Sequence, residues 1–477
     1  NIICNTIKIK IQDKNMSLKD KQFHFIAAGG VGMSALAKFL LEKGCTVTGS
    51  DISESKYVKM LKNMGADIKI GQKAENIKPN MTVVISSAIS EENPELKEAR
   101  RLNLEVLHRS DMLKLISDDF SQDKDAIFFG FSGTHGKTTT SGLCSYVLSK
   151  AGKHPSYAVG GFIPEIGDNS KFDSDKIFVA ELDESDGTIV KYRPDVNVIN
   201  NLSYDHPDFY KNGMSDIYAT FKKYIDGTSK DALLITNTDS EGCREFIKLM
   251  PERSFVTFGL NDADYTAKNI EFDGFSSKFD VYYKGEFKVK MEMSIPGIHN
   301  VYNALAVFAA LDLKGFHPEN MIEHFKTFTG MGRRFQKVTE FKNIKVYDDY
   351  AHHPEEIGTT LKSLSAYKGG RIVAVFQPHR FSRLQSLWND FLKVFDSVDK
   401  IYVTDVFHAC EEPIDGVNSE RFVNELQHKD KTYVGGDMQT VAEKIYPELK
   451  SGDLVITLGA GTVTQIGGIL KKLSENN

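Results

Sequence analysis

The chain has 477 residues, 41% of them hydrophobic and 26% charged, which is enough to build two to four globular domains. The net charge is only -6 and the basic residues form no run interleaved with aromatics, so we exclude a nucleic-acid-binding protein. No segment reaches the ~18 apolar residues of a membrane span, so we expect no membrane partner.

The five cysteines are scattered and show no CxxC spacing, which argues against a disulfide framework and against a zinc cage. We therefore expect a reducing, cytoplasmic environment. The first 20 residues lack the charged-then-apolar pattern of a signal peptide, and we interpret them as a peripheral extension. The sequence leaves a monomer and a homodimer both open.

From residue 21 to 120 the sequence repeats apolar strand, turn and helix, which predicts βαβ units and a parallel sheet. The first turn, GGVGMSA at residues 29–35, follows a strand and begins a helix, so its amides can hold a pyrophosphate. Asp51 ends the next strand, 19 residues after Gly32. The same layout is found in dinucleotide sites, where the acid binds the ribose. A turn that only packs tightly is a third interpretation.

A polar stretch at residues 117–126 predicts a linker to a second α/β block, residues 121–332. That block begins with a strand and the loop GFSGTHGKTTTSG, residues 130–142. Gly133 and Gly136 supply bare backbone, Lys137 a cation for the outer phosphates and Thr138 a hydroxyl for Mg²⁺, as in loops that bind nucleoside triphosphates. Phe131 stands where a regular loop has glycine. We therefore predict a shortened phosphate loop.

Two strand ends of the second block carry possible metal ligands. ELDESD, residues 181–186, places four carboxylates in six residues, and carboxylate oxygens bind hard cations. Asp205, His206 and Asp208 follow another strand. A solvated acidic turn and a structural histidine are the alternatives. The neighbouring phosphate loop favours metal binding, because such a loop needs a metal held from adjacent strand ends.

Short alternating strands between residues 253 and 295 predict an antiparallel insert, followed by a helix. The helix starts with His299, Asn300 and Asn303, and the two asparagines lie one turn apart on one face. Their amides could hold an adenine edge or phosphate oxygens, or they could only cap the helix. Arg333 and Arg334 follow and could clamp phosphate with permanent charges, or could simply be solvated.

A third α/β block occupies residues 333–477, and its strands also end in polar residues. Because α/β sheets bind ligands at the carboxyl ends of their strands, we expect these residues to line a site. They are Asp348, Asp349, His352, His353, His379, Arg380 and Arg383.

Over about residues 22 to 470 the chain resembles the Mur ligase family of peptidoglycan synthesis. The resemblance rests on these motifs, in chain order: GGVGMS, GTHGKTTT, ELDESDG, DHPDFY, GIHNVYNALA, GMGRRFQ, DDYAHHPEE and FQPHRFSR. It implies an α/β fold of three domains. They are a Rossmann-like N-terminal domain for a UDP substrate (21–120), a central P-loop ATPase-like domain (121–332) and a C-terminal Rossmann-like domain that closes on the amino acid and ATP (333–477).

The resemblance also implies an ATP-dependent ligase of cell wall biogenesis, with roles in cell shape and cell division. The γ-phosphoryl group of ATP would move to the lactyl carboxylate of UDP-N-acetylmuramic acid, and the amine of L-alanine would then displace phosphate. ATP and Mg²⁺ are the implied cofactors. A ligase of the same fold that adds a recycled murein tripeptide or another amino acid is the closest alternative. More distant alternatives are an NAD-dependent oxidoreductase and a non-catalytic nucleotide switch.

Carried over motif by motif, the resemblance implies four sets of site residues. The catalytic residues would be Lys137, Glu181, His206 and Arg334. ATP would contact Gly133, Thr134, Gly136, Lys137, Thr138, Thr139, Asn300, Asn303, Arg334 and Asp349. The UDP-sugar would contact Gly30, Gly32, Met33, Ser34, Asp51, Ser87, His108, Arg109, His353, His379, Arg380 and Arg383. Mg²⁺ would be bound by Thr138, Glu181 and His206.

Overall fold

The computed structural model describes residues 18–207, 209–273, 275–364, 367–409 and 411–475 and divides the chain into two compact units. The first unit runs to Gly160 and includes Asp168–Thr257, and the second comprises Gly161–Gly167 and the chain from Phe258. Of the predicted N-terminal extension, only Leu18–Asp20 lie within the described residues, where they form a 3-10 turn. No helix in the described ranges is long and apolar enough to cross a membrane.

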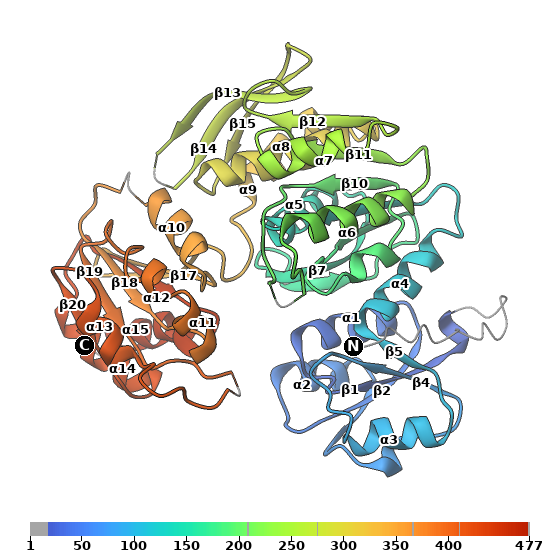
Figure 1. Ribbon diagram of the computed structural model, residues 1–477, viewed down its shortest axis with the longest axis horizontal. Helices are drawn as coiled ribbons and strands as arrows, with labels where there is room; N and C mark the ends of the chain where they lie inside the picture. Colours follow the sequence, from blue (N-terminus) through green and yellow to red (C-terminus); the bar gives the residue numbers. More distant parts are fainter. Residues whose placement is uncertain (1–17, 208, 274, 365–366, 410, 476–477) are drawn as a thin grey trace. The chain divides into compact units, whose positions relative to one another are not determined.

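The first unit begins with a parallel sheet in the strand order β3-β2-β1-β4-β5. Its strands are β1 (Gln22–Ile26), β2 (Thr46–Asp51), β3 (Asp67–Ile70), β4 (Met81–Ile85) and β5 (Val106–His108). The connecting helices are α1 (Val31–Glu42), α2 (Lys56–Asn63), α3 (Pro94–Arg101) and α4 (Arg109–Phe120), with α1 and α3 on opposite sides of the sheet (Figure 1). The strand order reverses between β1 and β4, which is where open α/β sheets bind ligands. The first glycine turn lies at this point, because it directly follows β1.

The rest of the first unit is built on strands in the order β11-β10-β6-β9-β7-β8. They are β6 (Ile127–Ser132), β7 (Ser156–Ile163), β8 (Asp168–Lys171), β9 (Ile177–Glu181), β10 (Val196–Ile199) and β11 (Leu233–Asn237). The helices are α5 (Lys137–Lys150), the 3-10 helix η3 (Thr188–Lys191), α6 (Met214–Asp226) and α7 (Glu241–Lys248). β6 pairs in parallel with β9 and β10, so the phosphate loop after β6 and the acidic turn after β9 begin at one sheet edge.

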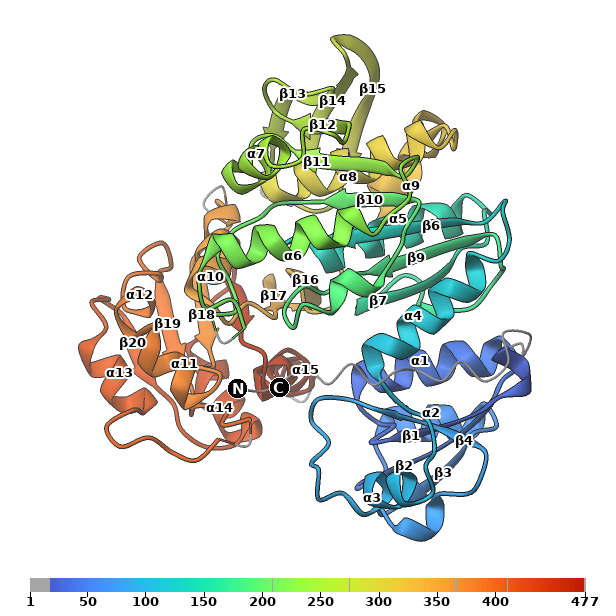
Figure 2. The ribbon, with the colours of Figure 1, turned by 45° about the vertical axis from the view of Figure 1, so that its right-hand side comes forward.

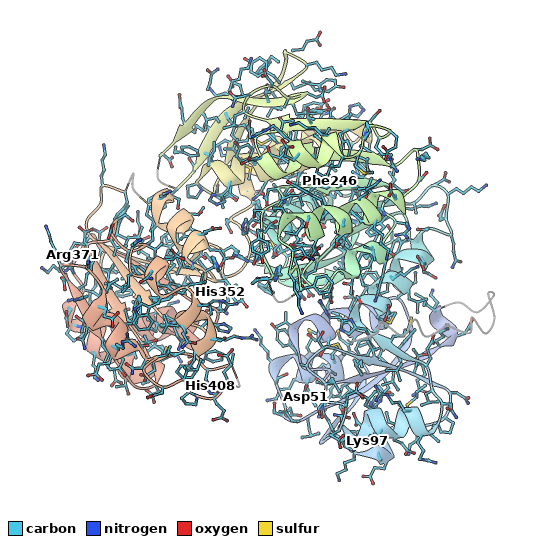
Figure 3. The ribbon with its side chains drawn as sticks, in the orientation of Figure 1. Asp51, Lys97, Phe246, His352, Arg371 and His408 are labelled. Atoms are coloured by element: carbon cyan, nitrogen blue, oxygen red, sulfur yellow. The ribbon has the colours of Figure 1, made fainter. Side chains whose placement is uncertain are left out.

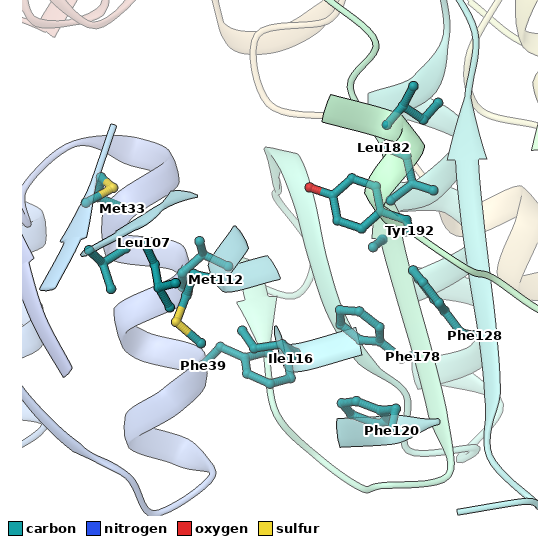
Figure 4. Packing of buried hydrophobic residues seen from close by; sticks show 14 of the residues in the cluster. Met33, Phe39, Leu107, Met112, Ile116, Phe120, Phe128, Phe178, Leu182 and Tyr192 are labelled. Carbon is teal, nitrogen blue, oxygen red and sulfur yellow. The ribbon is translucent and has the colours of Figure 1, made fainter. Parts of the chain in front are cut away.

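One hydrophobic cluster joins the first two predicted blocks (Figure 4). Phe39 of α1 and Phe120 of α4 pack against Phe178 of β9, and the rings of Phe120 and Phe178 stack at 4.8 Å and 15°. The prediction of a linker from residue 117 is therefore wrong for its first four residues. They continue α4, because burial of Phe120 extends the apolar stripe of that helix to its last turn.

The second unit contains the predicted antiparallel insert. After β12 (Phe255–Gly259), the strands β13 (Tyr265–Phe272), β14 (Ser277–Tyr283) and β15 (Glu286–Met293) pair antiparallel in sequence order. The helix α8 (Ile298–Leu313) follows, and then η4 (Pro318–Met321) and α9 (Ile322–Thr327). Alternate residues of β14 are buried, which fits a sheet with one covered face.

The third predicted block forms a sheet in the order β16-β17-β21-β18-β19-β20, in which only β16 and β17 pair antiparallel. The strands are β16 (Gln336–Phe341), β17 (Ile344–Asp349), β18 (Ile372–Phe376), β19 (Lys400–Val403), β20 (Lys431–Tyr433) and β21 (Leu454–Leu458). The helices are α10 (Pro354–Ser363), α11 (Phe381–Ser386), α12 (Trp388–Phe391), α13 (Ser419–Glu425), α14 (Met438–Ile445) and α15 (Gln465–Glu475), with short 3-10 turns at Tyr446–Glu448 and Thr462–Thr464.

Two separate cores cover the faces of this sheet. Ile372, Ala374 and Phe376 belong to a cluster with residues of α10 to α13, whereas Val373 and Val375 belong to one with α14 and α15. Successive strand residues point to opposite faces, so a continuous apolar strand supplies both cores. Figure 2 shows the helices around this sheet. The predicted α/β fold with parallel-rich sheets is confirmed.

Candidate active site

The first glycine turn is held by Asp51. The amide of Gly29 donates to Asp51 Oδ2 at 2.8 Å, and the amide of Ser53 donates to Oδ1 at 3.1 Å. A Cβ atom on Gly29 would lie 2.7 Å from Ser55 Oγ and 2.8 Å from Asp51 Oδ2, so a side chain at this position would have to displace these groups. Asp51 is 8% exposed at the end of β2 (Figure 3). The carboxylate therefore shapes the turn, which disfavours the ribose contact that a dinucleotide site requires.

Helix α1 starts directly after this turn, with Gly30 as its N-cap. The side chains of Met33 and Ser34 are buried, and Ser34 Oγ donates to Val31 O. Met33 can therefore reach a ligand only through its backbone amide, which lacks an intrahelical acceptor in the first turn. The amide of Ser34 already donates to the carbonyl of Gly30 at 2.8 Å, so the predicted substrate contact of Ser34 gains no support. Arg109, the first residue of α4, lies beside the turn, because a Cβ on Gly32 would be 3.2 Å from its Nη1.

Ser87 and His108 occupy the same edge of the sheet. Ser87 follows β4 and is exposed, and its Oγ lies 3.1 Å from Nε2 of His108 at the end of β5. His108 Nδ1 lies 2.9 Å from Ser110 Oγ, and burial lowers the pKa of the imidazole below its ordinary value. Gly32, Arg109, Ser87 and His108 thus all lie at the carboxyl edge of the first sheet, after β1, β4 and β5, and their contact with a substrate stays a prediction.

The phosphate loop packs against the segment that follows β10 and is hydrogen-bonded to it. Gly133 has φ +116°, and a Cβ there would lie 2.7 Å from the carbonyl oxygen of Asn201. Thr134 N donates to the same carbonyl, and His135 N donates to Asn201 Oδ1 at 2.8 Å. Gly136 has φ +83° and caps α5. Only glycine adopts these two conformations freely, which explains their spacing in the sequence.

Lys137 is the first residue of α5 and folds back onto its own loop. Its Nζ donates to Gly133 O at 2.8 Å, to Thr134 O at 3.3 Å and to Glu184 Oε1 at 2.9 Å. Glu184 is 3% exposed. Burial alone would lower the pKa of the ammonium, but nearby carboxylates, first among them Glu184, raise it above its ordinary value. Lys137 therefore carries a positive charge at the loop.

Thr138 and Glu181 form the oxygen pair predicted for Mg²⁺. Thr138 Oγ1 donates to Glu181 Oε1 at 3.0 Å, and the amide of Gly160 donates to Oε2 at 2.8 Å. Thr139, next on α5, is half-buried. A hydroxyl and a carboxylate beside a phosphate loop are the donor types that Mg²⁺ prefers, so these two residues fit the implied ion.

His206 is not part of this pair. It has φ +55°, and its Nε2 lies 3.7 Å from Asp205 Oδ2, with both side chains about 40% exposed. Asp208 lies outside the described residues. Within the described ranges, no group of three His, Cys, Asp or Glu side chains assembles as a metal site. The role of His206 in metal binding stays a prediction.

In the second unit, the two asparagines at the start of α8 lie on one face, as predicted, but they are buried. Asn303 Nδ2 donates to Asn300 Oδ1 at 3.2 Å, and Asn300 Nδ2 donates to Pro296 O at 2.7 Å. Both are less than 9% exposed, whereas His299 is exposed. Asn300 and Asn303 thus stabilise the helix start, and their contact with ATP stays a prediction.

Arg333 and Arg334 have different surroundings. Arg333 pairs with Asp348 Oδ2 at 3.2 Å, and its Nη2 donates to Gly459 O at 2.6 Å. The donors of Arg333 thus bind the chain itself, which gives no support to a phosphate contact by this residue. Arg334 is 37% exposed and lies 3.6 Å from Glu356 Oε1, over the ring of Tyr350. Arg334 is the more accessible of the two to a ligand.

Asp349 is buried at the end of β17, with 4% exposed. It accepts the amides of Phe335 at 2.8 Å and Ala351 at 2.7 Å, and burial raises its pKa to about 6. Asp348 accepts the hydroxyls of Thr457 and Thr464. Asp349 thus fixes the backbone around the strand end, whereas Asp348 binds side chains. This geometry gives no support to the predicted contact of Asp349 with a ribose.

Two histidines of the third block, His352 and His379, lie side by side, and Arg383 contacts one of them. The rings of His352 (Figure 3) and His379 are 5.5 Å apart, and His379 stacks on Phe407. Arg383 Nη1 lies 2.9 Å from His379 Nδ1. Because arginine only donates, His379 accepts at Nδ1. Burial, with help from the neighbouring cations, lowers the pKa of His379 to about 4, so the ring is a neutral donor at Nε2.

His353 and Arg380, two further residues predicted to contact substrate, lie next in sequence to these two histidines. His353 caps α10 in a capping box with Glu356, so it has a structural role in addition to the predicted substrate contact. Arg380 is exposed at the start of α11 with φ +67°. Its side chain is accessible to a ligand.

The sequence analysis missed residues that support the loop and the turn. Glu184 belongs to the acidic run, but its position three residues after Glu181 gave no reason to select it. Lys191, which binds Ser110 Oγ at 2.9 Å and Asp111 Oδ1 at 2.6 Å, belongs to no motif. Asn201 lies four residues before Asp205, the first residue of the quoted DHPDFY segment. Its partner in the loop could have been found only from the parallel pairing of β6 and β10.

Comparisons with known proteins cover nearly the whole chain. Residues 22–121 match the description "Mur ligase family, catalytic domain", residues 131–311 "Mur ligase middle domain" and residues 333–461 "Mur ligase, glutamate ligase domain". A UDP-N-acetylmuramate--L-alanine ligase of Geotalea daltonii is 38% identical over 465 residues, with 96% of this chain and 99% of the relative covered.

Solved structures agree. The crystal structure of the UDP-N-acetylmuramate-alanine ligase MurC from Thermotoga maritima has a TM-score of 0.81 and 27% identity, covering 96% of this chain and all of that one. A murein peptide ligase from Psychrobacter arcticus has a TM-score of 0.67 and 21% identity, over 95% of this chain and 98% of that one. The second likeness concerns the fold alone.

Proposed function

Since the chain belongs to the Mur ligase family, we propose that it is an ATP-dependent ligase that joins L-alanine to the lactyl carboxylate of UDP-N-acetylmuramate in peptidoglycan precursor synthesis. The observation that carries the proposal is the closed phosphate loop, with a charged Lys137 at the start of α5 and Thr138 bonded to Glu181. Relatives at 38% identity over nearly their full length carry the name of this ligase.

The chemistry needs a leaving group on the carboxylate. One carboxylate oxygen attacks the γ-phosphorus of ATP, the bond to the bridging oxygen of ADP breaks, and an acyl phosphate forms. The neutral amine of alanine then attacks the acyl carbon, the C–O bond to phosphate breaks, and the amine loses a proton. The products are the amide, ADP and phosphate. Most of the protein's contribution to phosphoryl transfer is positioning and charge stabilisation.

The phosphate loop has the parts for this task. Lys137 supplies the positive charge for the oxygens of the transferring group, and its exchangeable bonds to Gly133 O and Thr134 O are the ones that phosphate oxygens can replace. Thr138 and Glu181 would hold Mg²⁺ by their hydroxyl and carboxylate oxygens. When bound, the ion would neutralise negative charge on the phosphates.

The first sheet has the features expected for the UDP part of the substrate. The glycine turn at β1, the start of α1 and Arg109 lie at the edge where α/β sheets bind ligands, and Arg109 can pair with phosphate. We assign residues 21–120 to this role, 121–332 to ATP, and the accessible Arg334, His379, Arg380 and Arg383 to the phosphoryl and acyl groups. The roles of Asn300, Asn303 and Asp349 toward ATP remain predictions.

The free thiols are consistent with a cytoplasmic enzyme, which we also propose. Cys45, Cys144 and Cys243 are buried and unbridged, and reducing compartments keep cysteines in this form.

A product assay tests the proposal. The purified chain is incubated with ATP, Mg²⁺ and UDP-N-acetylmuramate and with each member of a panel of amino acids, including L-alanine, glycine, L-serine and a murein tripeptide. We expect ADP and a UDP-N-acetylmuramoyl amide with L-alanine in preference to the others. A product with the tripeptide alone would assign the chain to the recycling ligases. Reduction or oxidation of a nicotinamide cofactor, without ADP, would contradict ligase activity.

A further inference from the structure

A chain of hydrogen bonds runs from Lys191 to the exposed hydroxyl of Ser87. Lys191 Nζ donates to Ser110 Oγ at 2.9 Å, Ser110 Oγ lies 2.9 Å from His108 Nδ1, and His108 Nε2 lies 3.1 Å from Ser87 Oγ. Lys191 ends η3, which follows the acidic turn after β9, whereas Ser87 follows β4, His108 ends β5 and Ser110 belongs to α4. All four lie in the first unit.

The direction of every bond in this chain is determined. A lysine ammonium can only donate, so Ser110 Oγ accepts from Lys191 and its own hydrogen is left for His108. The amide of Ser110 also donates to His108 Nδ1, at 3.3 Å, so Nδ1 must carry a lone pair. A neutral imidazole with a free Nδ1 has its proton on Nε2. His108 therefore donates to Ser87 Oγ, and the Ser87 hydrogen must point to another acceptor.

The position of Ser87 indicates what that acceptor is. Ser87 lies two residues beyond β4, which is the neighbour of β1 in the sheet. The first glycine turn follows β1 at the same edge, where the strand order reverses. The exposed hydroxyl of Ser87 is thus beside the turn to which we assign the nucleotide sugar, a ligand rich in phosphate, carbonyl and hydroxyl oxygens.

We propose that Lys191 is a positioning residue for substrate, which acts through Ser110 and His108 to make Ser87 a fixed hydrogen-bond donor to an oxygen of the nucleotide sugar. The identity of the ligand rests on the proposed function, but the order of the bonds does not. Cooperative chains of this kind strengthen the final donor. The chain also makes substrate binding at the first sheet depend on η3, which belongs to the segment that carries Glu181 and Glu184.

Two variants and a control test the relay by calorimetric titration with UDP-N-acetylmuramate. Lys191→Met removes the first donor, and Ser87→Ala removes the last. Lys114→Met removes an exposed lysine of α4 that pairs with Asp118. We expect Lys191→Met and Ser87→Ala each to weaken binding about tenfold, the size of one hydrogen bond to a charged or polar ligand atom. Binding of ATP should not change, and Lys114→Met should bind both ligands as the wild type does.

The double variant distinguishes a relay from two independent contacts. If Lys191 acts only through Ser87, Lys191→Met with Ser87→Ala should lose no more affinity than Ser87→Ala alone, whereas additive losses would overturn the proposal. A Lys191→Met variant that binds like the wild type would also overturn it.

The histidine tautomer provides a second readout that needs no ligand. Long-range ¹H–¹⁵N spectra of protein labelled at histidine, with His108 assigned by its loss in His108→Gln, should show the proton on Nε2. Lys191→Met should shift His108 towards a mixture of tautomers or a higher pKa. A proton on Nδ1 in the wild type would contradict the relay. If the wild type bound no UDP-N-acetylmuramate, the proposed function would fail, and the tautomer would still decide the relay.

Discussion

Lys137 Nζ lies 2.9 Å from both carboxylate oxygens of Glu184, which is almost completely buried. Two backbone carbonyls of the phosphate loop accept the remaining hydrogens of this ammonium. The chain itself therefore satisfies all donors of this lysine when no nucleotide is bound. An arriving phosphate can replace the carbonyls without loss of the ion pair, so Glu184 keeps Lys137 charged and oriented.

Replacement of Glu184 by Gln should move the alkaline limit of kcat to lower pH. The carboxylate raises the pKa of Lys137, and without it the ammonium loses its proton at a lower pH and can no longer balance charge on the phosphoryl group. The measurement is the pH profile of kcat at saturating substrates. Glu245→Gln, which removes a carboxylate from the surface of α7, is the control. An alkaline limb that coincides with that of the wild type would show that Glu184 has no influence on Lys137.

Substitution of Glu181 or His206 by Ala should raise the Mg²⁺ concentration needed for half-maximal activity. Glu181 is bonded to Thr138 beside the phosphate loop, and carboxylate and hydroxyl oxygens suit Mg²⁺. Activity is titrated with Mg²⁺ at constant ATP, and Asp123→Ala, which removes a surface partner of Lys176, serves as control. If only Glu181→Ala responds, His206 is not a ligand. An unchanged Mg²⁺ requirement in both variants would exclude the proposed metal site.

Gly32→Val should weaken binding of UDP-N-acetylmuramate by at least about tenfold, the loss expected for one hydrogen bond to a charged group. A Cβ at this position lies 3.2 Å from Arg109 Nη1, so the valine displaces the guanidinium and blocks the approach of a pyrophosphate to the backbone. ATP binding should be unchanged. Gly468→Val adds the same side chain where no atom lies within 4 Å of the Cβ position. Equal losses for both ligands would indicate unfolding, and a loss confined to NADH would support an oxidoreductase.

Asp349 should make the C-terminal block less stable as the pH rises from about 4 to about 6. Its folded pKa is raised to about 6 by burial, so in this window the folded state keeps a proton that the unfolded state has lost. Stability from this group is complete below pH 4 and is lost as the pH passes 6, at about 1.4 kcal/mol per pH unit.

The measurement compares urea unfolding of the wild type and of Asp349→Asn across this range. Trp388 is the only tryptophan and packs against the same cluster as the residues around Asp349, so its fluorescence reports unfolding of this block. The stability advantage of the wild type over the variant should shrink with increasing pH. A constant difference would show that Asp349 is not protonated in the folded state.

Local sequence patterns were sufficient to predict those structural features that lie within a single short segment. The order of Gly133, Gly136, Lys137 and Thr138 identified the phosphate loop, because the left-handed glycines and the helix start lie within a few residues. The first turn was predicted for the same reason. The role of Asp51 in holding that turn was not, because the spacing of an acid after a glycine turn is the same for a structural partner and for a ribose contact.

Contacts between distant segments could not be predicted. For Arg333 the sequence left a phosphate contact and a solvated side chain open, but its partners include Gly459, more than a hundred residues away. Whether Asp349 is buried depends on Phe335 and α10, which close over the end of β17. Phe120 lies in a stretch whose composition predicts a polar linker, but its ring packs on Phe178. In each case the sequence specifies a residue type, and the tertiary partner decides its role.

Isotope transfer tests the central claim, phosphorylation of the substrate carboxylate, most directly. UDP-N-acetylmuramate with ¹⁸O in its lactyl carboxylate is incubated with the chain, ATP, Mg²⁺ and L-alanine, and the inorganic phosphate is analysed by mass spectrometry. Phosphate that leaves an acyl phosphate keeps the oxygen that attacked the γ-phosphorus. We predict that each phosphate formed from doubly labelled carboxylate carries one ¹⁸O. Amide product accompanied by unlabelled phosphate would contradict the account.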